Sequence, residues 1–241
     1  MSSQVPAWMS FIITFTYIFL IVLVSAGLPR RLNVVGRPDL GRAVLWRIGA
    51  FLTTWLSLVL ILGLQGFFSP DPTARAPRIA YAIIPFALSI GLFLLSTSFR
   101  RMVDGIPPQW TIGLQANRIL GALFLVAFTQ GLLPAQFAIP AGIGDVLVSL
   151  AAPFVAYLLI VKHPQARSIG LLWNTFGILD LLLAITLGVL TSPGQLHRLA
   201  LNTPNLLMSA YPFVLIPAFG VPIWLLLHFF SLRELKQRRS I

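Results

Sequence analysis

Residues 141–161 read AGIGDVLVSLAAPFVAYLLIV and contain one charged side chain, that of Asp145. A helix needs about 20 predominantly apolar residues to cross the roughly 30 Å hydrocarbon core of a bilayer. This stretch is long enough and apolar enough to be such a helix. The whole chain has the same character, with 57% hydrophobic and only 10% charged residues. A soluble globular domain, in which about 25% of residues are charged, is therefore excluded.

Six further stretches of similar length and hydropathy occur along the chain. The seven predicted spans lie near residues 6–28, 44–68, 79–98, 117–137, 141–161, 168–190 and 205–230. The fourth and fifth are separated only by an uncharged connector around Pro134 and Pro140. No connector is long enough to bury a core of its own. We therefore predict an all-α, polytopic bundle of seven transmembrane helices, formed by residues 1–241 as a single transmembrane domain without a soluble domain.

The positions of the 17 Lys and Arg residues predict an orientation. With seven spans, Arg75, Arg78 and Arg198 fall on one side of the membrane, and all other cations fall on the opposite side. Cytoplasmic loops are enriched in Lys and Arg, so we predict an outer N-terminus and a cytoplasmic C-terminus in a cell inner membrane. The first span is then a reverse-oriented anchor rather than a signal peptide. The positive charge therefore specifies the orientation of the chain in the lipid bilayer, and no nucleic-acid partner is predicted.

Polar residues inside the spans are the candidates for a binding site, because an unpaired polar group in hydrocarbon is costly. Asp145 and Asp180 are the two acidic residues within the predicted spans. Helical rise places Asp180 near the midplane and Asp145 about 9 Å toward the outer face. Asn174 and Gln130 extend this track of polar residues in depth. Arg118, at the inner end of its predicted span, is a candidate cationic partner, or else an interfacial residue that extends to the headgroups.

The last predicted span contains Pro212, Pro217 and Pro222, with Gly220 between the last two prolines. Each proline removes a helical hydrogen bond, so this seventh helix is predicted to be broken or kinked. Broken helices often form the binding sites of membrane transporters. We therefore predict that these four residues act as hinges.

The segment Gly142-Ile143-Gly144-Asp145 resembles the GxGD motif of intramembrane aspartyl proteases. The resemblance covers four residues and implies that Asp145 and Asp180 form a catalytic pair of carboxylates. The chain has no cysteine, and His163, His197 and His228 fall at different levels of the predicted topology, each as an interfacial residue. No metal site and no cofactor are therefore predicted.

Three functions remain open. The spread of polar residues through the membrane favours transport of a small solute or ion, with the proton as one coupling ion. The first alternative is a noncatalytic membrane subunit, or a protein that binds a hydrophobic ligand or pigment, with a membrane-protein partner or a second copy of the chain. The second alternative is a protease of the GxGD type. We predict no catalytic residue and favour a protein that is not an enzyme.

Overall fold

The computed structural model describes residues 5–34, 44–82 and 106–237, together with isolated positions between 83 and 105. All secondary structure in this part of the chain is helical. Six of the described helices are long and apolar enough to cross a membrane: Ala7–Gly27, Trp46–Leu64, Pro108–Thr129, Ala135–Ile160, Ala166–Thr191 and Ile216–Gln237. The chain thus has the helices of a multi-pass membrane protein, as predicted. The predicted span at 79–98 lies partly outside the described residues.

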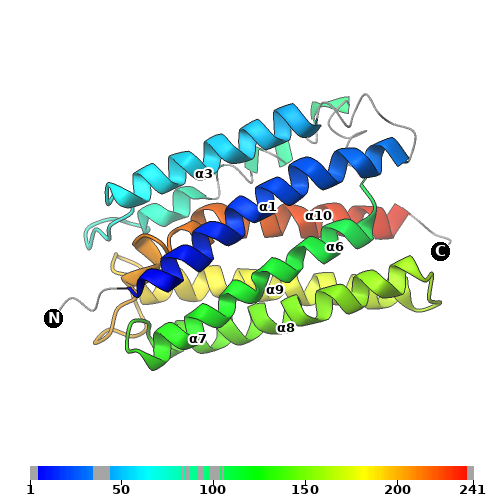
Figure 1. The fold of residues 1–241 in the computed structure, drawn as a ribbon. Coiled ribbons are helices and arrows are strands. Elements are labelled where there is room, and N and C mark those ends of the chain that lie inside the picture. The colour runs from blue at the N-terminus through cyan, green and yellow to red at the C-terminus, as the bar shows by residue number, and fades with distance from the viewer. Residues whose placement is uncertain are drawn as a thin grey trace.

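The first two spans pack against each other. Helix α1 (Ala7–Val34) is followed by the short π-helix η1 (Val44–Ile48) and by α3 (Gly49–Leu64), which runs back alongside α1 (Figure 1). Gly49 permits this close approach, because a Cβ atom there would lie 2.7 Å from the Ser25 hydroxyl oxygen. These helices carry aromatic and aliphatic side chains into the core, among them Tyr17 and Trp55.

The next described span is continuous but changes its winding in the middle. Helix α6 (Pro108–Leu114) leads into the 3₁₀ segment η3 (Gln115–Gly121) and then into α7 (Ala122–Thr129). Pro108 occupies the first turn, where a missing N–H costs nothing. The prediction that this span begins at residue 117 is therefore wrong, because the polar residues before 117 are helical and several of them face the bundle interior.

Helices α8 (Ala135–Ile160) and α9 (Ala166–Thr191) form a long pair in contact along their length. Each is about 39 Å long at 1.5 Å per residue. Pro134 precedes the first residue of α8, whereas Pro140 lies inside it. The connector between the fourth and fifth spans therefore lies at 130–134, earlier than predicted, and the GxGD-like segment is helical.

The last span begins later than residue 205. The 3₁₀ turn η4 (Leu207–Ser209) precedes it, and the membrane-length helix consists of the π-helix η5 (Ile216–Gly220) followed by α10 (Val221–Gln237). Val221 donates its N–H to Ile216, five residues earlier, and the following Pro222 has no N–H to donate. Pro217 lies in the first turn of η5. Pro217 therefore lies within a widened turn and Pro222 directly after it, while Pro212 precedes the helix.

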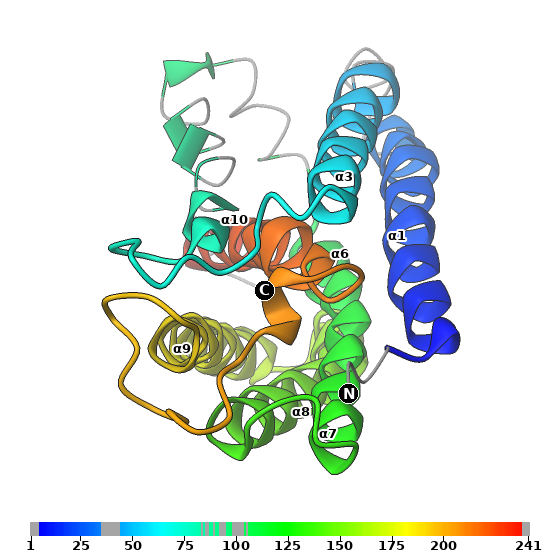
Figure 2. The ribbon, with the colours of Figure 1, turned by 90° about the vertical axis from the view of Figure 1, so that its left-hand side faces the viewer.

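Helix α10 lies between the α1–α3 pair and the α8–α9 pair (Figures 1 and 2). The N-terminal end of α1 and the C-terminal end of α10 are at opposite ends of the bundle (Figure 1). The 3₁₀ turn η2 (Arg78–Ala82) contacts η5 at the beginning of the last span, whereas Asp104 binds Arg233 near its end. Helix η2 and Asp104 therefore lie near opposite ends of the last span, about 20 Å apart along its axis.

Candidate buried charge cluster

Arg118 lies at the middle of the bundle. Its span, Pro108–Thr129, places it at the centre of the helix, and its side chain has 0% exposure. The expectation that Arg118 lies at the inner end of a span is wrong. The reason is that the helix begins at Pro108, so that residue 118 lies at its centre. A fully buried guanidinium at mid-depth requires acceptors for its donors, because an unpaired charge is far more costly there than at the interface.

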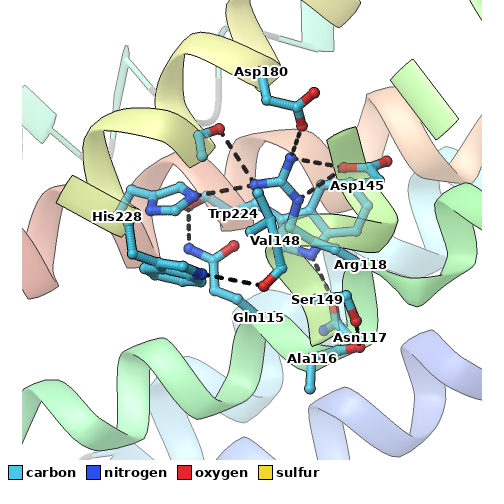
Figure 3. Close-up of polar contacts among 12 residues, drawn as sticks. Gln115, Ala116, Asn117, Arg118, Asp145, Val148, Ser149, Asp180, Trp224 and His228 are labelled. Atoms are coloured by element: carbon cyan, nitrogen blue, oxygen red, sulfur yellow. Dashed lines mark hydrogen bonds and ion pairs between the residues drawn. The ribbon is translucent and has the colours of Figure 1, made fainter. Parts of the chain in front are cut away.

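Two aspartates from neighbouring helices supply carboxylate acceptors (Figure 3). Arg118 Nε donates to Asp145 Oδ1 at 2.8 Å, and Nη2 lies 2.7 Å from the same oxygen. Arg118 Nη2 also forms an ion pair with Asp180 Oδ2. The guanidinium thus joins α8 to α9 from η3. Both carboxyl side chains are buried, at 4% and 5% exposure.

The two aspartates lie at nearly the same depth. Asp145 is about 4 Å from the centre of Ala135–Ile160, and Asp180 is about 2 Å from the centre of Ala166–Thr191. Because α8 and α9 are antiparallel, both displacements point toward the same end of the bundle. The separation in depth inferred from the predicted spans is therefore wrong. Its cause is the start of α8, which lies at Ala135 rather than at residue 141.

Glycines make room for the charged side chains. A Cβ atom on Gly144 would overlap the carboxylate of Asp180, and one on Gly121 would overlap the side chain of Asp145. A Cβ atom on Gly177 would overlap the ring of His228. The glycine of the GxGD-like segment that directly precedes Asp145 thus has a packing role, since it allows α9 to bring its carboxylate against α8.

A second set of polar side chains continues from Arg118 on the other side (Figure 3). Arg118 Nη1 contacts the Gly177 carbonyl oxygen at 3.3 Å and His228 Nε2 at 3.1 Å. His228 Nδ1 lies 2.9 Å from Asn174 Oδ1, which also accepts a hydrogen bond from the Ser231 hydroxyl. Asn174 Nδ2 donates to the Gly170 carbonyl at 2.8 Å. His228, expected at the interface, is fully buried instead.

The 3₁₀ segment that contains Arg118 is held by three further hydrogen bonds. The Ser149 hydroxyl donates to the Ala116 carbonyl, and Trp224 Nε1 donates to Asn117 Oδ1 at 2.6 Å. Gln115 Nε2 donates to the Trp224 carbonyl at 3.3 Å. The centre of the Trp224 ring is 5.5 Å from the Arg118 guanidinium carbon, which is within the range of a cation–π contact. Side chains from α8 and α10 therefore hold the 3₁₀ segment that presents the arginine.

Of the residues predicted for the polar track, the structure brings four together. Arg118, Asp145 and Asp180 are in direct contact, and Asn174 joins them through His228. Gln130 is not part of this cluster, because it is exposed in the turn that follows α7. Its role in binding stays a prediction without support from this geometry.

The contribution of the last span to this cluster was not predicted from the sequence. His228, Ser231 and Trp224 all lie on α10, where they face the cluster or its backbone support. Their spacing was the available signal, because positions 224, 228 and 231 are four and three residues apart and so share one helical face. Placing the end of the span at residue 230 concealed this signal.

The cluster contains more acidic than basic groups. One guanidinium carries a single positive charge, and two carboxylates carry two negative charges when both are ionised. In the described part of the chain, Asp145 Oδ2 and Asp180 Oδ1 form no hydrogen bond or ion pair. A net negative charge is costly at this depth. The cluster is therefore electrically balanced when it holds one proton or one small cation.

One family match includes the entire cluster. Residues 76–236 match a family described as a domain of unknown function (DUF8737), so the chain belongs to this family. The matched region begins just before η2 and ends within α10. No curated protein and no solved structure matches the chain.

Proposed function

We propose that this member of the DUF8737 family is a membrane transporter that moves a small solute or ion together with a proton, and that the Arg118 cluster holds the coupling proton. The observation that supports this proposal is the two-to-one ratio of carboxylates to guanidinium at mid-depth. A simple structural ion pair needs one carboxylate, and a second ionisable group buried in a membrane is the usual mark of an ion pathway or proton relay.

Two irregular segments next to the cluster support a role for motion. Arg118 lies in the 3₁₀ segment η3, and the π-helix η5 is directly followed by α10, which carries His228. Irregular turns inside long helices are often functional hinges. Pro217, Gly220 and Pro222 would then act as the hinge around η5. Pro212, which precedes the helix, would act as the pivot of the chain that enters it.

The same geometry gives no support to protease chemistry. An aspartyl protease needs two carboxylates that share a proton and activate a water molecule between them. Here the Arg118 guanidinium pairs with both Asp145 and Asp180. The guanidinium, which pairs with both carboxylates, occupies the place where that water molecule would have to bind.

The distribution of described cations favours an outer N-terminus and a cytoplasmic C-terminus. Gln195 bonds to the loop at Thr73 and Ala74, which brings the loops of Arg75 and Arg198 to one end of the bundle. Arg167 and Arg233 lie at the other end, where Arg167 bonds to the Leu235 carbonyl. We propose that this second, more basic end faces the cytoplasm of a cell with an inner membrane.

Labelling of introduced cysteines tests this orientation, because the chain has no native cysteine. Thr73→Cys and Gln165→Cys place one thiol at each end of the bundle. A membrane-impermeant maleimide added to intact cells should label Cys at position 73 and should label position 165 only after lysis. The reverse pattern would contradict the proposed orientation.

Proton movement tests the proposed transport. Purified protein is reconstituted into vesicles of phosphatidylethanolamine and phosphatidylglycerol that contain a pH-sensitive dye, and a potassium diffusion potential drives protons inward. We expect proton entry above that of empty vesicles for the wild type and the background rate for Asp145→Asn and Asp180→Asn. Asp104→Asn is the matched control, since Asp104 also binds an arginine but lies outside the cluster.

Infrared spectroscopy reports on the proton itself. A protonated carboxyl group gives a carbonyl stretch that shifts in D₂O, and this band should be present in the wild type and reduced in Asp145→Asn or Asp180→Asn. Background proton entry in the wild type without this band would overturn the proposal. The aspartates would then hold helices together in a noncatalytic subunit that acts with a membrane-protein partner or a second copy.

A further inference from the structure

The hydrogen bonds of Arg118 determine which ring nitrogen of His228 carries its proton. A guanidinium has five N–H donors and no acceptor. The Arg118 Nη1 that contacts His228 Nε2 can therefore only donate, so Nε2 must be an unprotonated acceptor. The proton of a neutral ring then lies on Nδ1, which faces Asn174 Oδ1 at 2.9 Å.

The orientation of Asn174 fits this assignment. Its Nδ2 donates to the Gly170 carbonyl, and its Oδ1 receives the Ser231 hydroxyl, so Oδ1 is the atom that faces the histidine. Polar atoms on both sides of the ring thus fix the same tautomer. The hydrogen bonds run in one direction, from Arg118 through His228 to Asn174.

A second proton on His228 is incompatible with this arrangement. An imidazolium would direct an N–H at Nε2 toward the donor groups of Arg118, and two positive charges would then be in contact. The ring can accept that proton only if the guanidinium turns away from Nε2. The other neighbours offer no compensating charge, since Gly177 contributes a backbone carbonyl and Trp173 an aromatic ring whose centre is 5.1 Å away.

The charged and titratable groups around His228 are few in the described structure. Arg118 faces it from η3, and Asp145 and Asp180 act through Arg118 from α8 and α9. Helix α6, which also packs on α10, has no titratable side chain. Glu234, on α10 itself, is nearly two helical turns away from His228.

We propose that His228 is a second proton-binding site, which is closed while Arg118 donates to it and opens when the guanidinium leaves Nε2. This inference rests on the proposed function, since it adds the acceptor for the proton held by the carboxylates. A carboxyl O–H bond of Asp145 or Asp180 breaks, and an N–H bond forms at His228 Nε2. The total charge of Asp145, Asp180, Arg118 and His228 is the same before and after this transfer.

Conservation of charge permits the transfer within a membrane. With the proton on a carboxylate, one ionised carboxylate balances Arg118 and His228 is neutral. With the proton on His228, two ionised carboxylates balance Arg118 and the imidazolium. Neither state leaves a net charge at mid-depth, which is the costly condition. Movement of Arg118 separates the two states, so the guanidinium acts as the gate between two proton sites.

Nitrogen NMR of the histidine ring tests the closed state. The chain has three histidines, so His163→Gln with His197→Gln leaves His228 as the only ring in the spectrum. In ¹⁵N-histidine-labelled protein in lipid bilayers, we expect the neutral form with the proton on Nδ1 to persist at acidic pH where free histidine is charged. An Nε2-protonated neutral ring, or titration like that of free histidine, would overturn the proposal.

A conservative substitution tests the transfer step. His228→Gln can accept from Arg118 through its amide oxygen but cannot bind a proton in this range of pH. We expect it to retain the infrared band of the protonated carboxyl and to lose the potential-driven proton entry. His163→Gln, an exposed histidine outside the cluster, is the matched control and should retain both.

The outcomes separate the two proposals. Wild-type proton entry in His228→Gln would overturn the role of His228 and leave proton-linked transport through the aspartates intact. Failure of the wild type to move protons would overturn the proposed function, while the NMR spectrum would still decide whether Arg118 closes His228. Loss of the infrared band in His228→Gln would contradict the separation of the two sites.

Discussion

Arg118 and Arg233 both bind aspartate at ordinary hydrogen-bond length, yet their surroundings differ. Arg118 Nε lies 2.8 Å from Asp145, and Arg233 Nε lies 2.9 Å from Asp104. The side chain of Arg118 has 0% exposure, whereas those of Arg233 and Asp104 have 30% and 35%. Solvent and salt screen the second pair and leave the first unscreened. Similar geometry therefore serves two purposes, an interfacial contact in one place and a buried charge centre in the other.

The comparison predicts the largest effect for loss of the buried guanidinium. Arg118→Met keeps the approximate length of the side chain but leaves the two carboxylates without their cation. Breaking a buried ion pair in this way costs about 3–5 kcal/mol. We expect that loss in unfolding free energy, measured by titration of the purified protein with sodium dodecyl sulfate in detergent micelles.

The control for this prediction removes the charges together. Arg118→Met combined with Asp145→Asn and Asp180→Asn leaves no uncompensated charge, so most of the lost stability should return. If the triple variant were as unstable as the single variant, geometry rather than charge balance would be the main contribution of Arg118.

The second prediction concerns the glycine that makes room for Asp180. Gly144→Ala places a methyl group where the carboxylate lies, and the carboxylate must move away from Arg118. Overpacking of this kind costs about 1–3 kcal/mol, and the same titration should detect it. Gly113→Ala is the matched control, because its new methyl would meet Ala156 Cβ at 3.9 Å, an ordinary contact. Equal stability of the two variants would contradict the close packing described here.

A smaller effect on the unfolding free energy is expected at the partly exposed pair of Asp104 and Arg233. Asp104→Asn removes the charge that binds Arg233 at a half-exposed site. Exposed ion pairs contribute about 0–1 kcal/mol, so the unfolding free energy should change within this range and should depend on salt. A loss as large as that of Arg118→Met would show that burial does not explain the difference between the two arginines.

The smallest effect is expected at Asp71, in a loop outside the membrane-spanning helices. The Thr73 hydroxyl donates to the Asp71 carboxylate at 2.6 Å and the Thr73 N–H donates at 2.9 Å, and these bonds lower the pKa of Asp71. A lowered pKa stabilises the fold above the ordinary value of 3.8, and the contribution disappears as the pH falls through the lowered value. Thr73→Val should move the pKa up toward 3.8, measured by carbon NMR of the carboxyl group. An unchanged pKa would assign the shift to the remaining N–H bond or to nearby Arg78.

Much of the cluster could be predicted from the scarcity of charge within the apolar stretches. Asp145, Asp180 and Asn174 were predicted because polar groups at membrane depth need partners, and all three belong to the observed network. Their mutual arrangement could not be predicted, because depth was calculated from span boundaries. These boundaries are set by mean hydropathy. Polar residues that face the bundle interior lower the mean hydropathy of a span.

The same error displaced both Arg118 and His228. Residues 108–116 include Gln109, Thr111 and Gln115, so hydropathy excluded a helical segment whose polar side chains mostly face inward. At the other end of the chain, α10 continues to Gln237 beyond the predicted limit at residue 230. Arg118 and His228 therefore lie at the centres of their helices and not at the interface, where they were predicted. Charge patterning predicts on which side of the membrane each loop lies, but it contains no information on depth.

The contact between Gly144 and Asp180 links two positions that are far apart in sequence. A side chain at 144 and a carboxylate from 180 compete for the same space, so a chain can hold one of them but not both in this packing. Across related sequences, the two positions should therefore covary. Members with alanine or a larger residue at 144 are expected to have a small, uncharged residue at 180, and those members would have one carboxylate for each guanidinium and a different balance of charge.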